Sequence, residues 1–227
     1  MKSLSLPDIY RSTNLNTIRM WEDNAEIREI RKENYYDPVK LALSTGIKPR
    51  MPFSVSQLIN ELNELTRDDP LADILPEHSF HFTFLPLTRP LYKANERLPS
   101  KVEQLKNIWA GYHSKKIVIR ELRLIALPSQ LLLAGIPDEP VIAMRQSFCE
   151  KILGSNWKDE LLMRHSCSPL PAPFWHSTIL RYSAAFIPVT VREYFLERQE
   201  MDYGDVTGEL TLARISYNWR KFYPLEI

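Results

Sequence analysis

The sequence carries a short His-x-Thr pattern twice, at residues 81–84 and at residues 176–179. In an extended chain, successive side chains point to opposite faces. His81 and Thr83 therefore share one face of a predicted strand, and the phenylalanines that alternate with them take the other face. The second copy places its histidine and threonine in the same relation, with an isoleucine on the apolar side. The pattern predicts that two imidazoles and two hydroxyls converge on one cleft.

Length and charge limit the classes of protein that this chain can form. Its 227 residues are enough for one good-sized core or for two small lobes packed closely together. The hydrophobic content of 44% and charged content of 25% are typical of globular proteins. A net charge of only +1 argues against a protein that coats long nucleic acid, because such proteins carry a clear basic excess. A small nucleotide or an RNA end remains compatible with this charge.

No apolar run approaches the length that crosses a membrane, so we expect no membrane partner. Asp8 and Arg11 interrupt the start of the chain before the apolar core of a signal peptide can build. The two cysteines, Cys149 and Cys167, lack the paired spacing of a zinc site, and we interpret both as reduced packing residues. Together these features predict a cytoplasmic protein without a metal site.

Residues 1–70 lack the His-x-Thr pattern and are predicted to be mostly helical. A short helix is expected over residues 37–46, with Asp and Pro at its start and Gly at its end. A clearer helix follows from the capping box at residues 54–57 and stops before the Asp-Pro pair at 69–70. Two interpretations remain for this N-terminal segment: an additional helical layer on the core, or a lid over the cleft.

After residue 70 the expected elements repeat in order. Each His-x-Thr strand is followed by a helix with a capping box and then by a return strand. This order predicts two similar lobes related by a pseudo-two-fold axis, each giving its central strand to a shared groove. The expected elements are strands at 79–87, 116–126, 130–136, 174–182 and 209–219, and helices at 100–112, 141–154, within 155–173, and at 190–201.

A pair of imidazoles suits the opening of a cyclic phosphate. One group must remove a proton from the attacking oxygen and another must protonate the departing oxygen, and histidine titrates near neutral pH. Threonine hydroxyls beside them can donate hydrogen bonds to the phosphoryl oxygens as charge builds there. Such a reaction requires neither a metal nor another cofactor.

The two motifs resemble those of the 2H phosphoesterases, which are named for paired H-Φ-[S/T]-Φ sequences. The first copy matches fully, whereas the second departs from the pattern at Ser177, and the resemblance covers roughly residues 75–222. It implies an α+β, bilobal 2H phosphoesterase-like fold over residues 71–227, with two antiparallel-sheet lobes and outer helices, after an N-terminal helical extension at 1–70. The catalytic set that it implies is His81, Thr83, His176 and Thr178.

Residues near the motif strands are candidates for substrate contact. On strict alternation Tyr182 shares the face of His176 and could stack on a base, while Arg181 points the other way and reaches a phosphate only if the strand twists or ends there. Phe174 is a second candidate platform for a base, with packing as the alternative. Tyr92, together with Arg89, follows the first motif strand and could line the rim of the cleft.

We therefore expect a metal-independent phosphodiesterase that takes a nucleotide 2′,3′-cyclic phosphate, or a 2′,5′ or 3′,5′ phosphodiester, at an RNA end or in a small oligonucleotide. One alternative is an enzyme that degrades a cyclic oligonucleotide defence signal. Another is a non-catalytic nucleotide-binding module, and a third is a helical interaction protein built on residues 1–70. The motifs do not assign which histidine is the base and which the acid.

Overall fold

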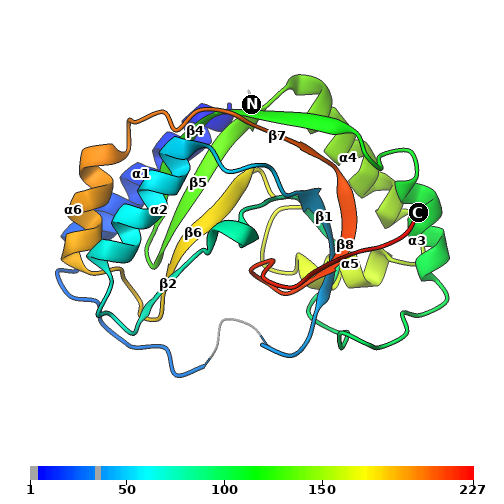
Figure 1. Ribbon diagram of the computed structural model, residues 1–227, viewed down its shortest axis with the longest axis horizontal. Helices are drawn as coiled ribbons and strands as arrows, with labels where there is room; N and C mark the ends of the chain where they lie inside the picture. Colours follow the sequence, from blue (N-terminus) through cyan, green and yellow to red (C-terminus); the bar gives the residue numbers. More distant parts are fainter. Residues whose placement is uncertain (1–4, 34–36) are drawn as a thin grey trace.

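The computed structural model describes residues 5–33 and 37–227, and its strands form two antiparallel sheets. One sheet is curled, and the two lie side by side, each with its own helices, so the predicted α+β bilobal architecture is confirmed (Figure 1). The four-stranded sheet has the order β3 (Phe82–Pro86), β1 (Ala42–Ile47), β8 (Thr211–Ile215), β9 (Phe222–Pro224). The five-stranded sheet has the order β2 (Ala72–Ile74), β6 (His176–Tyr182), β5 (Gln130–Pro137), β4 (Lys116–Leu127), β7 (Val206–Glu209).

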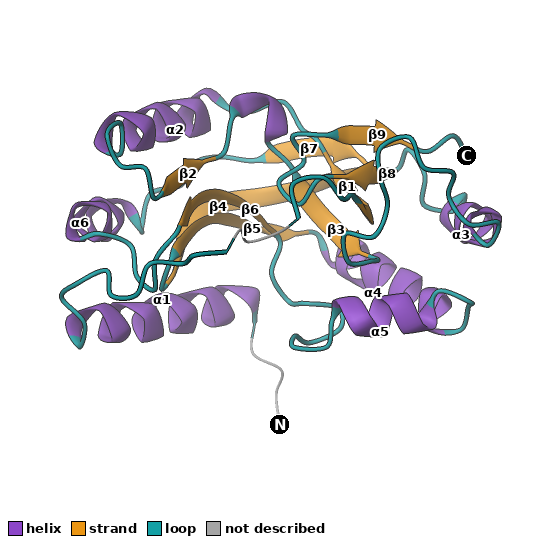
Figure 2. Ribbon diagram, turned by 90° about the horizontal axis from the view of Figure 1, so that it is seen from below, coloured by secondary structure: helices purple, strands orange, loops and turns teal. Residues whose placement is uncertain are grey.

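The helices divide between the two sheets. Helix α1 (Leu6–Glu22) lies along one face of the five-stranded sheet, while α2 (Phe53–Leu65) and α6 (Val189–Arg198) pack against each other beside the same sheet (Figure 2). The other lobe carries α3 (Val102–Trp109), α4 (Glu139–Leu153) and α5 (Lys158–Arg164), with α4 against β3. A short 3-10 helix, η1 (Glu77–Ser79), precedes the first motif strand.

Helix α1 is fixed to the sheet by polar side chains as well as by packing. The Thr17 hydroxyl donates to the carbonyl of Ala126 over 2.8 Å, and the Asn14 side-chain oxygen accepts from the Ala126 N–H, also over 2.8 Å. The Tyr10 hydroxyl donates to the carbonyl of Gly135 over 2.9 Å. These groups are buried or partly buried, so the bonds form away from competing water. Helix α1 is therefore a layer on the core, one of the two interpretations given for the N-terminal segment.

The short helix expected over residues 37–46 is wrong. Residues 42–47 form β1, which pairs with β3 on one side and with β8 on the other. The local sequence favours a helix here, but hydrogen bonding with two strands that are distant in the chain outweighs this preference. Strand β1 thus takes part of the N-terminal segment into the core of the second predicted domain. The division of the chain at residue 70 stays a prediction, and this strand argues against it.

The helices predicted from capping boxes are present, but the caps are not used. Helix α2 begins one residue before Ser54, whose hydroxyl instead donates to the carbonyl of Tyr203 over 2.7 Å. Helices α3 and α6 begin after Lys101 and Pro188, also without a side-chain cap. The spacing of apolar residues identified these helices correctly, whereas the proposed caps at Ser54, Ser100 and Thr190 are wrong.

The strand expected over residues 209–219 divides into two strands that belong to different sheets. Strand β7 pairs with β4, and after the buried Leu210 the chain continues as β8, which pairs with β1. The return strands are thus exchanged, because β4 follows β3 but lies in the sheet of β6. Strand β3 is also an edge strand rather than a central one, which corrects the expectation that each lobe gives its central strand to the groove.

The remaining predictions concern the cysteines and the membrane. In the described part of the chain both cysteines are free; Cys149 is buried as predicted, but Cys167 is exposed, so its packing role is wrong. Within residues 5–33 and 37–227, no helix combines the length and hydrophobicity that a membrane span needs. The expectation about the start of the chain involves residues 1–4, which lie outside the described residues.

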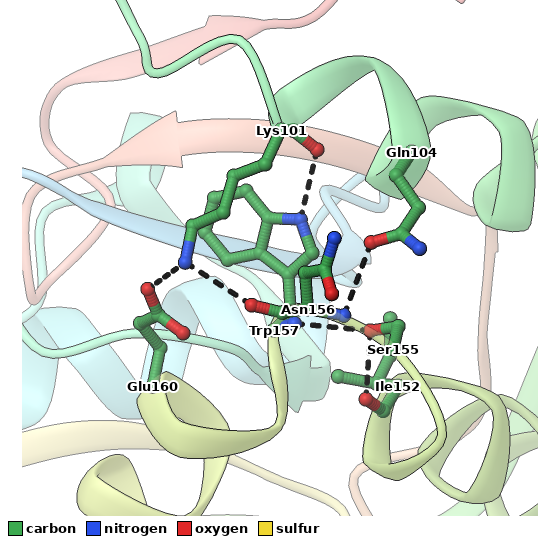
Figure 3. A network of polar contacts seen from close by, with 7 residues as sticks. All are labelled: Lys101, Gln104, Ile152, Ser155, Asn156, Trp157 and Glu160. Carbon is green, nitrogen blue, oxygen red and sulfur yellow. Dashed lines mark hydrogen bonds and ion pairs between the residues drawn. The ribbon is translucent and has the colours of Figure 1, made fainter.

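A polar network fixes α5 to α3 and to the end of α4 (Figure 3). The indole of Trp157 donates to the carbonyl of Lys101 over 3.1 Å, and the Lys101 ammonium lies over the Trp157 ring at 4.6 Å from its centroid. The same ammonium donates to the carbonyl of Asn156 over 3.1 Å and forms an ion pair with Glu160 on α5. The Asn156 N–H donates to Gln104 over 3.1 Å. Helix α5 is consequently held in one position relative to α3.

Candidate active site

The two motif strands meet between the sheets, beside a cavity of about 600 Å³. Strands β3 and β6 belong to different sheets, yet their Cα atoms approach within 8 Å. The volume is in the range of pockets that hold small organic ligands. All four residues of the predicted catalytic set line this cavity: His81, Thr83, His176 and Thr178. The structure therefore brings them together as expected, while their catalytic roles stay a prediction.

Both motif strands carry a β-bulge at the same point, directly after the motif threonine. In β6, Thr178 and Leu180 oppose consecutive residues of β5, so Ile179 is an extra residue. In β3, Thr83 and Leu85 oppose consecutive residues of β1, so Phe84 is the extra residue. A bulge of this kind shifts the alternation of side chains by one position. Residues beyond the threonines consequently change faces in both lobes.

The bulge in β6 decides between two predicted substrate contacts. Arg181 lines the cavity, and its guanidinium lies over the ring of Tyr217 at 5.1 Å. Tyr182 points away from the cavity, and its hydroxyl donates to Asp69 over 2.8 Å. The predicted placement of Tyr182 on the His176 face is therefore wrong, because period-2 alternation ends at the bulge.

Of the other two predicted substrate contacts, one lines the cavity and one does not. Phe174 lines the cavity, with its ring edge-on to that of His176 at 6.1 Å between centroids. Tyr92 is buried beside Leu41, with which it forms a β-bridge, and it lies outside the cavity lining. Its expected place at the rim is wrong, whereas Arg89 does line the cavity.

The imidazole of His81 is held in a defined tautomer. Its Nδ1 lies 2.7 Å from the carbonyl oxygen of Ser79. A carbonyl only accepts hydrogen bonds, so Nδ1 carries the proton and Nε2 keeps a lone pair. The ring is 5% exposed and stacks on the indole of Trp219, with the centroids 4.7 Å apart and the planes inclined by 11°. Such a ring is oriented to accept a proton at Nε2.

Burial keeps both imidazoles neutral at neutral pH in the unliganded protein. It lowers the pKa of His81 to about 3, and the charges of Arg181 and His176 add to the effect. Burial likewise lowers the pKa of His176 to about 4, together with the charges of Arg181 and Arg145. The Nδ1 atom of His176 is buried without a hydrogen-bond partner in the described part of the chain, so no neighbour fixes its tautomer.

Arg145 supports the strand that carries His176. This buried side chain donates to the carbonyls of Phe174 and Pro173 over 3.2 and 3.3 Å, and it stacks on the Trp175 ring at 3.9 Å from its centroid. Burial lowers its pKa only to about 10, so the guanidinium stays charged at neutral pH. It therefore adds positive charge to the cavity beside the second histidine.

Several residues that line the cavity were not found from the sequence. Ser44 lies on β1 with its hydroxyl buried and unpartnered in the described residues, in a segment that the local sequence predicts to be helical. His165 lies at the end of α5, and its two ring nitrogens contact the carbonyl of Pro86 at 3.0 Å and the hydroxyl of Ser168 at 3.3 Å. Hydropathy alternation could have identified Ser44. No local signal identifies Arg145, His165, Tyr217 and Trp219.

The described residues contain no group of three or more histidine, cysteine, aspartate or glutamate side chains able to hold a metal ion. The chemistry of the lining is instead that of an anion site: imidazoles, hydroxyls and guanidinium groups. Hydroxyl and guanidinium groups donate hydrogen bonds to phosphate oxygens, whereas imidazole can serve either a phosphate or a metal.

Comparison with known proteins identifies the fold but gives no match by sequence. No family model and no curated protein matches the chain. Among solved structures, it is similar to the TT0787 protein of Thermus thermophilus, with a TM-score of 0.51, 16% identity, and coverage of 82% of this chain and 95% of that one. A structure described as a phosphoesterase gives a TM-score of 0.52 at 14% identity, covering 82% and 96%.

The LigT protein of E. coli is a further structural match. Its apo form gives a TM-score of 0.50 at 14% identity, covering 82% of this chain and 95% of that one. Its complex with 3′-AMP gives the same TM-score and identity, covering 82% and 96%. The chain thus shares the bilobal fold of these solved structures over about four-fifths of its length, at an identity too low to carry a shared activity by itself.

Proposed function

We propose that this protein is a metal-independent phosphodiesterase that opens a nucleotide cyclic phosphate, with His81 and His176 as its acid–base pair. The observation that carries the proposal is the convergence of two His-x-Thr pairs, 95 positions apart in the chain by their numbering, on one cavity. The shared fold with LigT, which has been solved in complex with 3′-AMP, supports a nucleotide as the ligand. A 2′,3′-cyclic phosphate at an RNA end or on a mononucleotide is the substrate that we place first.

His81 is the better candidate for the base. Its Nδ1–H is bonded to the Ser79 carbonyl, so its Nε2 lone pair can accept a proton from the attacking water. As that proton leaves, the water oxygen bonds to phosphorus. If a neighbouring ribose hydroxyl attacks instead, the same nitrogen takes the hydroxyl proton and the product is a terminal cyclic phosphate.

His176 is then the acid. It must carry a proton on each ring nitrogen, and an anionic phosphate bound beside it raises its pKa from the low value of the unliganded protein. The P–O bond to the ribose breaks, and the proton of His176 passes to the departing oxygen. After one turnover His81 holds the extra proton and His176 is neutral, and exchange with water restores the starting state.

The remaining groups stabilise the negative charge that develops on the non-bridging oxygens of the phosphate. Thr83 and Thr178 lie one alternation step from the two histidines, and their hydroxyls can donate to the non-bridging oxygens. Arg181 lines the same region and is not engaged in an ion pair with any described carboxylate, so its charge is available to the phosphate.

The test is turnover in the presence of EDTA. Wild-type protein is incubated with 2′,3′-cyclic nucleotides, 2′,5′-oligoadenylate and cyclic dinucleotides, and the products are separated by chromatography. We expect hydrolysis of a 2′,3′-cyclic phosphate that survives chelation, and a loss of roughly 10²- to 10⁴-fold in kcat for His81→Ala and for His176→Ala. His113→Ala, at an exposed position outside the cavity, is the matched control and should keep activity within about twofold.

Other outcomes separate the rival functions. Binding of these nucleotides without turnover would identify a non-catalytic binding module. Preferential cleavage of a cyclic dinucleotide would place the protein with enzymes that degrade signalling nucleotides. Activity that EDTA abolishes would contradict the proposed mechanism directly.

A further inference from the structure

The cavity carries more positive charge than one phosphate needs. Among the described residues its lining includes a single carboxylate, Asp37, which already accepts the N–H groups of Val39 and Lys40. In the part of the chain that the structure describes, no arginine of the cavity forms an ion pair with a carboxylate. The lining arginines are Arg89, Arg145, Arg164 and Arg181.

These arginines fall into two groups. Arg181 and Arg145 lie close enough to His176 for their charges to lower its pKa, and Arg181 does the same to His81. Arg164 acts instead on His165, at the end of α5. Arg89 belongs to this second group, because its Nε donates to the carbonyl of Met163 over 3.0 Å on the same helix.

The second group lies at a distance from the reacting histidines. His165 contacts the carbonyl of Pro86 at 3.0 Å, and Pro86 is three positions beyond Thr83 on β3. Because Phe84 is the extra residue of the bulge, Thr83 and Pro86 oppose Gly46 and Ser44, which are two residues apart on β1. A strand rises by about 3.2 to 3.4 Å per residue, so the Pro86 end of the cavity is roughly 7 Å from Thr83. A phosphate bound between the histidines would not reach that far. The second group of arginines therefore faces a different part of any ligand.

The geometry of this second group suits a phosphate. Two hydrogen bonds fix the Arg89 guanidinium, one from Nε to Met163 and one from Nη2 to the Ser166 hydroxyl over 3.1 Å. Its remaining N–H groups are still free to donate, since guanidinium has five. The Arg164 side chain, within the described residues, makes no hydrogen bond or ion pair at all. Helix α5, which presents Arg164, is held rigidly by the network around Lys101 and Trp157 (Figure 3).

We propose that the cavity binds two phosphate groups at once, the reacting one between His81 and His176 and a second, unreacted one at Arg89 and Arg164. The identity of the reacting group rests on the proposed function, whereas the second site depends only on the arginines and their spacing. The preferred substrate is then a nucleotide or short oligonucleotide that carries a further phosphate, rather than a nucleoside with a cyclic phosphate alone. Arginine is well suited to this role because its planar donors match phosphate oxygens in pairs.

Binding of non-reacting products tests the second site without relying on catalysis. Calorimetry on the wild-type chain compares adenosine 3′-monophosphate with adenosine 3′,5′-bisphosphate, and the dinucleotide ApAp with pApAp. We expect the 5′-phosphate to tighten binding about tenfold in at least one pair. Arg164→Ala and Arg89→Ala should each remove most of that gain and leave the affinity for the ligand lacking the 5′-phosphate within about twofold. Arg50→Ala, which removes an exposed charge outside the cavity, should leave the gain intact.

Each result bears on the inference. A gain in only one pair supports it and fixes the spacing between the two phosphates. No gain in either pair, or a gain that survives in both arginine variants, overturns it. Should Arg89→Ala unfold because Arg89 is bonded to α5, Arg164→Ala carries the test, since the Arg164 side chain loses no hydrogen bond or ion pair to any described residue. Tighter binding of the 5′-phosphorylated ligands without any hydrolysis in the EDTA assay would overturn the proposed function and support the second site. Hydrolysis without tighter binding would support the proposed function and overturn the second site.

Discussion

The indole of Trp219 stacks on the imidazole of His81, with ring centroids 4.7 Å apart and planes 11° from parallel. The ring of Phe222 also stacks on this indole, with centroids 5.5 Å apart and planes 19° from parallel, and the Lys48 ammonium lies 4.9 Å from the Phe222 centroid. Trp219 holds this place with a φ of 57°, in the left-handed region that non-glycine residues seldom adopt. Strain at such a position is typically compensated by packing or by function.

Replacing Trp219 should alter the titration of His81. Trp219→Leu removes the aromatic ring that shields the imidazole from water. The His81 ring is then better solvated, so its pKa rises from about 3 towards 6.5. We expect kcat/KM to fall by roughly tenfold or more, because the imidazole loses its fixed orientation, and the acid limb of its pH profile to move to higher pH. The checks are that profile and an NMR titration of His81. Trp219→Phe, which keeps a stacking ring, should behave almost as wild type, and an unchanged His81 titration in Trp219→Leu would contradict the argument.

Gly46 makes room for this stack. A Cβ atom at this position would lie 2.4 Å from the carbonyl oxygen of Phe82 and 2.8 Å from Cη2 of Trp219. Gly46→Ala should therefore lower the free energy of unfolding by about 1 to 3 kcal/mol, as overpacking does in other cores. It should also reproduce the activity loss of the Trp219 variant. Gly111→Ala is the matched control, because its Cβ would meet no atom within 4 Å. Urea denaturation of both variants decides the point, and equal stabilities would refute it.

The sequence predicted what depends on local pattern. Apolar spacing located helices α2, α3, α4 and α6, and the His-x-Thr alternation placed the polar face of both motif strands in one cavity. The sequence did not predict the structure of segments whose conformation depends on pairing with strands that are distant in the chain. The local sequence of residues 42–47 favours a helix, yet these residues form a strand that pairs with β3 and with β8. Tertiary pairing overrides propensity in such cases.

The placement of Arg181 and Tyr182 shows why the candidate site was only partly predictable. Strict alternation gave Tyr182 to the cavity, but the extra residue Ile179 reverses the faces beyond it. A bulge costs one ladder position and is stabilised by neighbouring strands, so a single sequence does not reveal it. Trp219 and Arg145 were not predicted as cavity residues for a similar reason. They reach the site through the fold of β8–β9 and of α4, far from either motif.

The buried histidines should make the protein less stable in acid. In the unfolded chain an imidazole takes up a proton as the pH falls through about 6.5, whereas in the folded protein the pKa is about 3 for His81 and about 4 for His176. Between pH 6.5 and about 4 the unfolded state therefore binds more protons, and the free energy of unfolding falls with falling pH. One imidazole contributes at most about 1.4 kcal/mol per pH unit.

Urea midpoints at pH 7 and pH 5 measure this effect. From pH 7 to pH 5 each imidazole should contribute a loss of roughly 2 kcal/mol, so the wild type should lose roughly 4 kcal/mol more than the double variant His81→Gln, His176→Gln, in which neither side chain titrates. His113→Gln, altered at an exposed histidine, should follow the wild type. If the double variant loses as much stability as the wild type, the histidines are not buried in the neutral form.

Ligand binding should reverse this titration. An anionic phosphate between His81 and His176 favours the protonated form of the neighbouring imidazole, so the pKa of His176 rises from about 4 when the ligand binds. Binding of adenosine 3′-monophosphate near pH 7, where the free nucleotide is mostly a dianion, should then take up protons, up to about one per protein. Calorimetry in two buffers of different ionisation enthalpy measures this number directly. His176→Gln should bind the nucleotide with little proton uptake, whereas His165→Gln, in which the lost imidazole faces Pro86 and Ser168, should keep it. Uptake that is absent in the wild type, or that persists in His176→Gln, would show that His176 is not the group that becomes the acid.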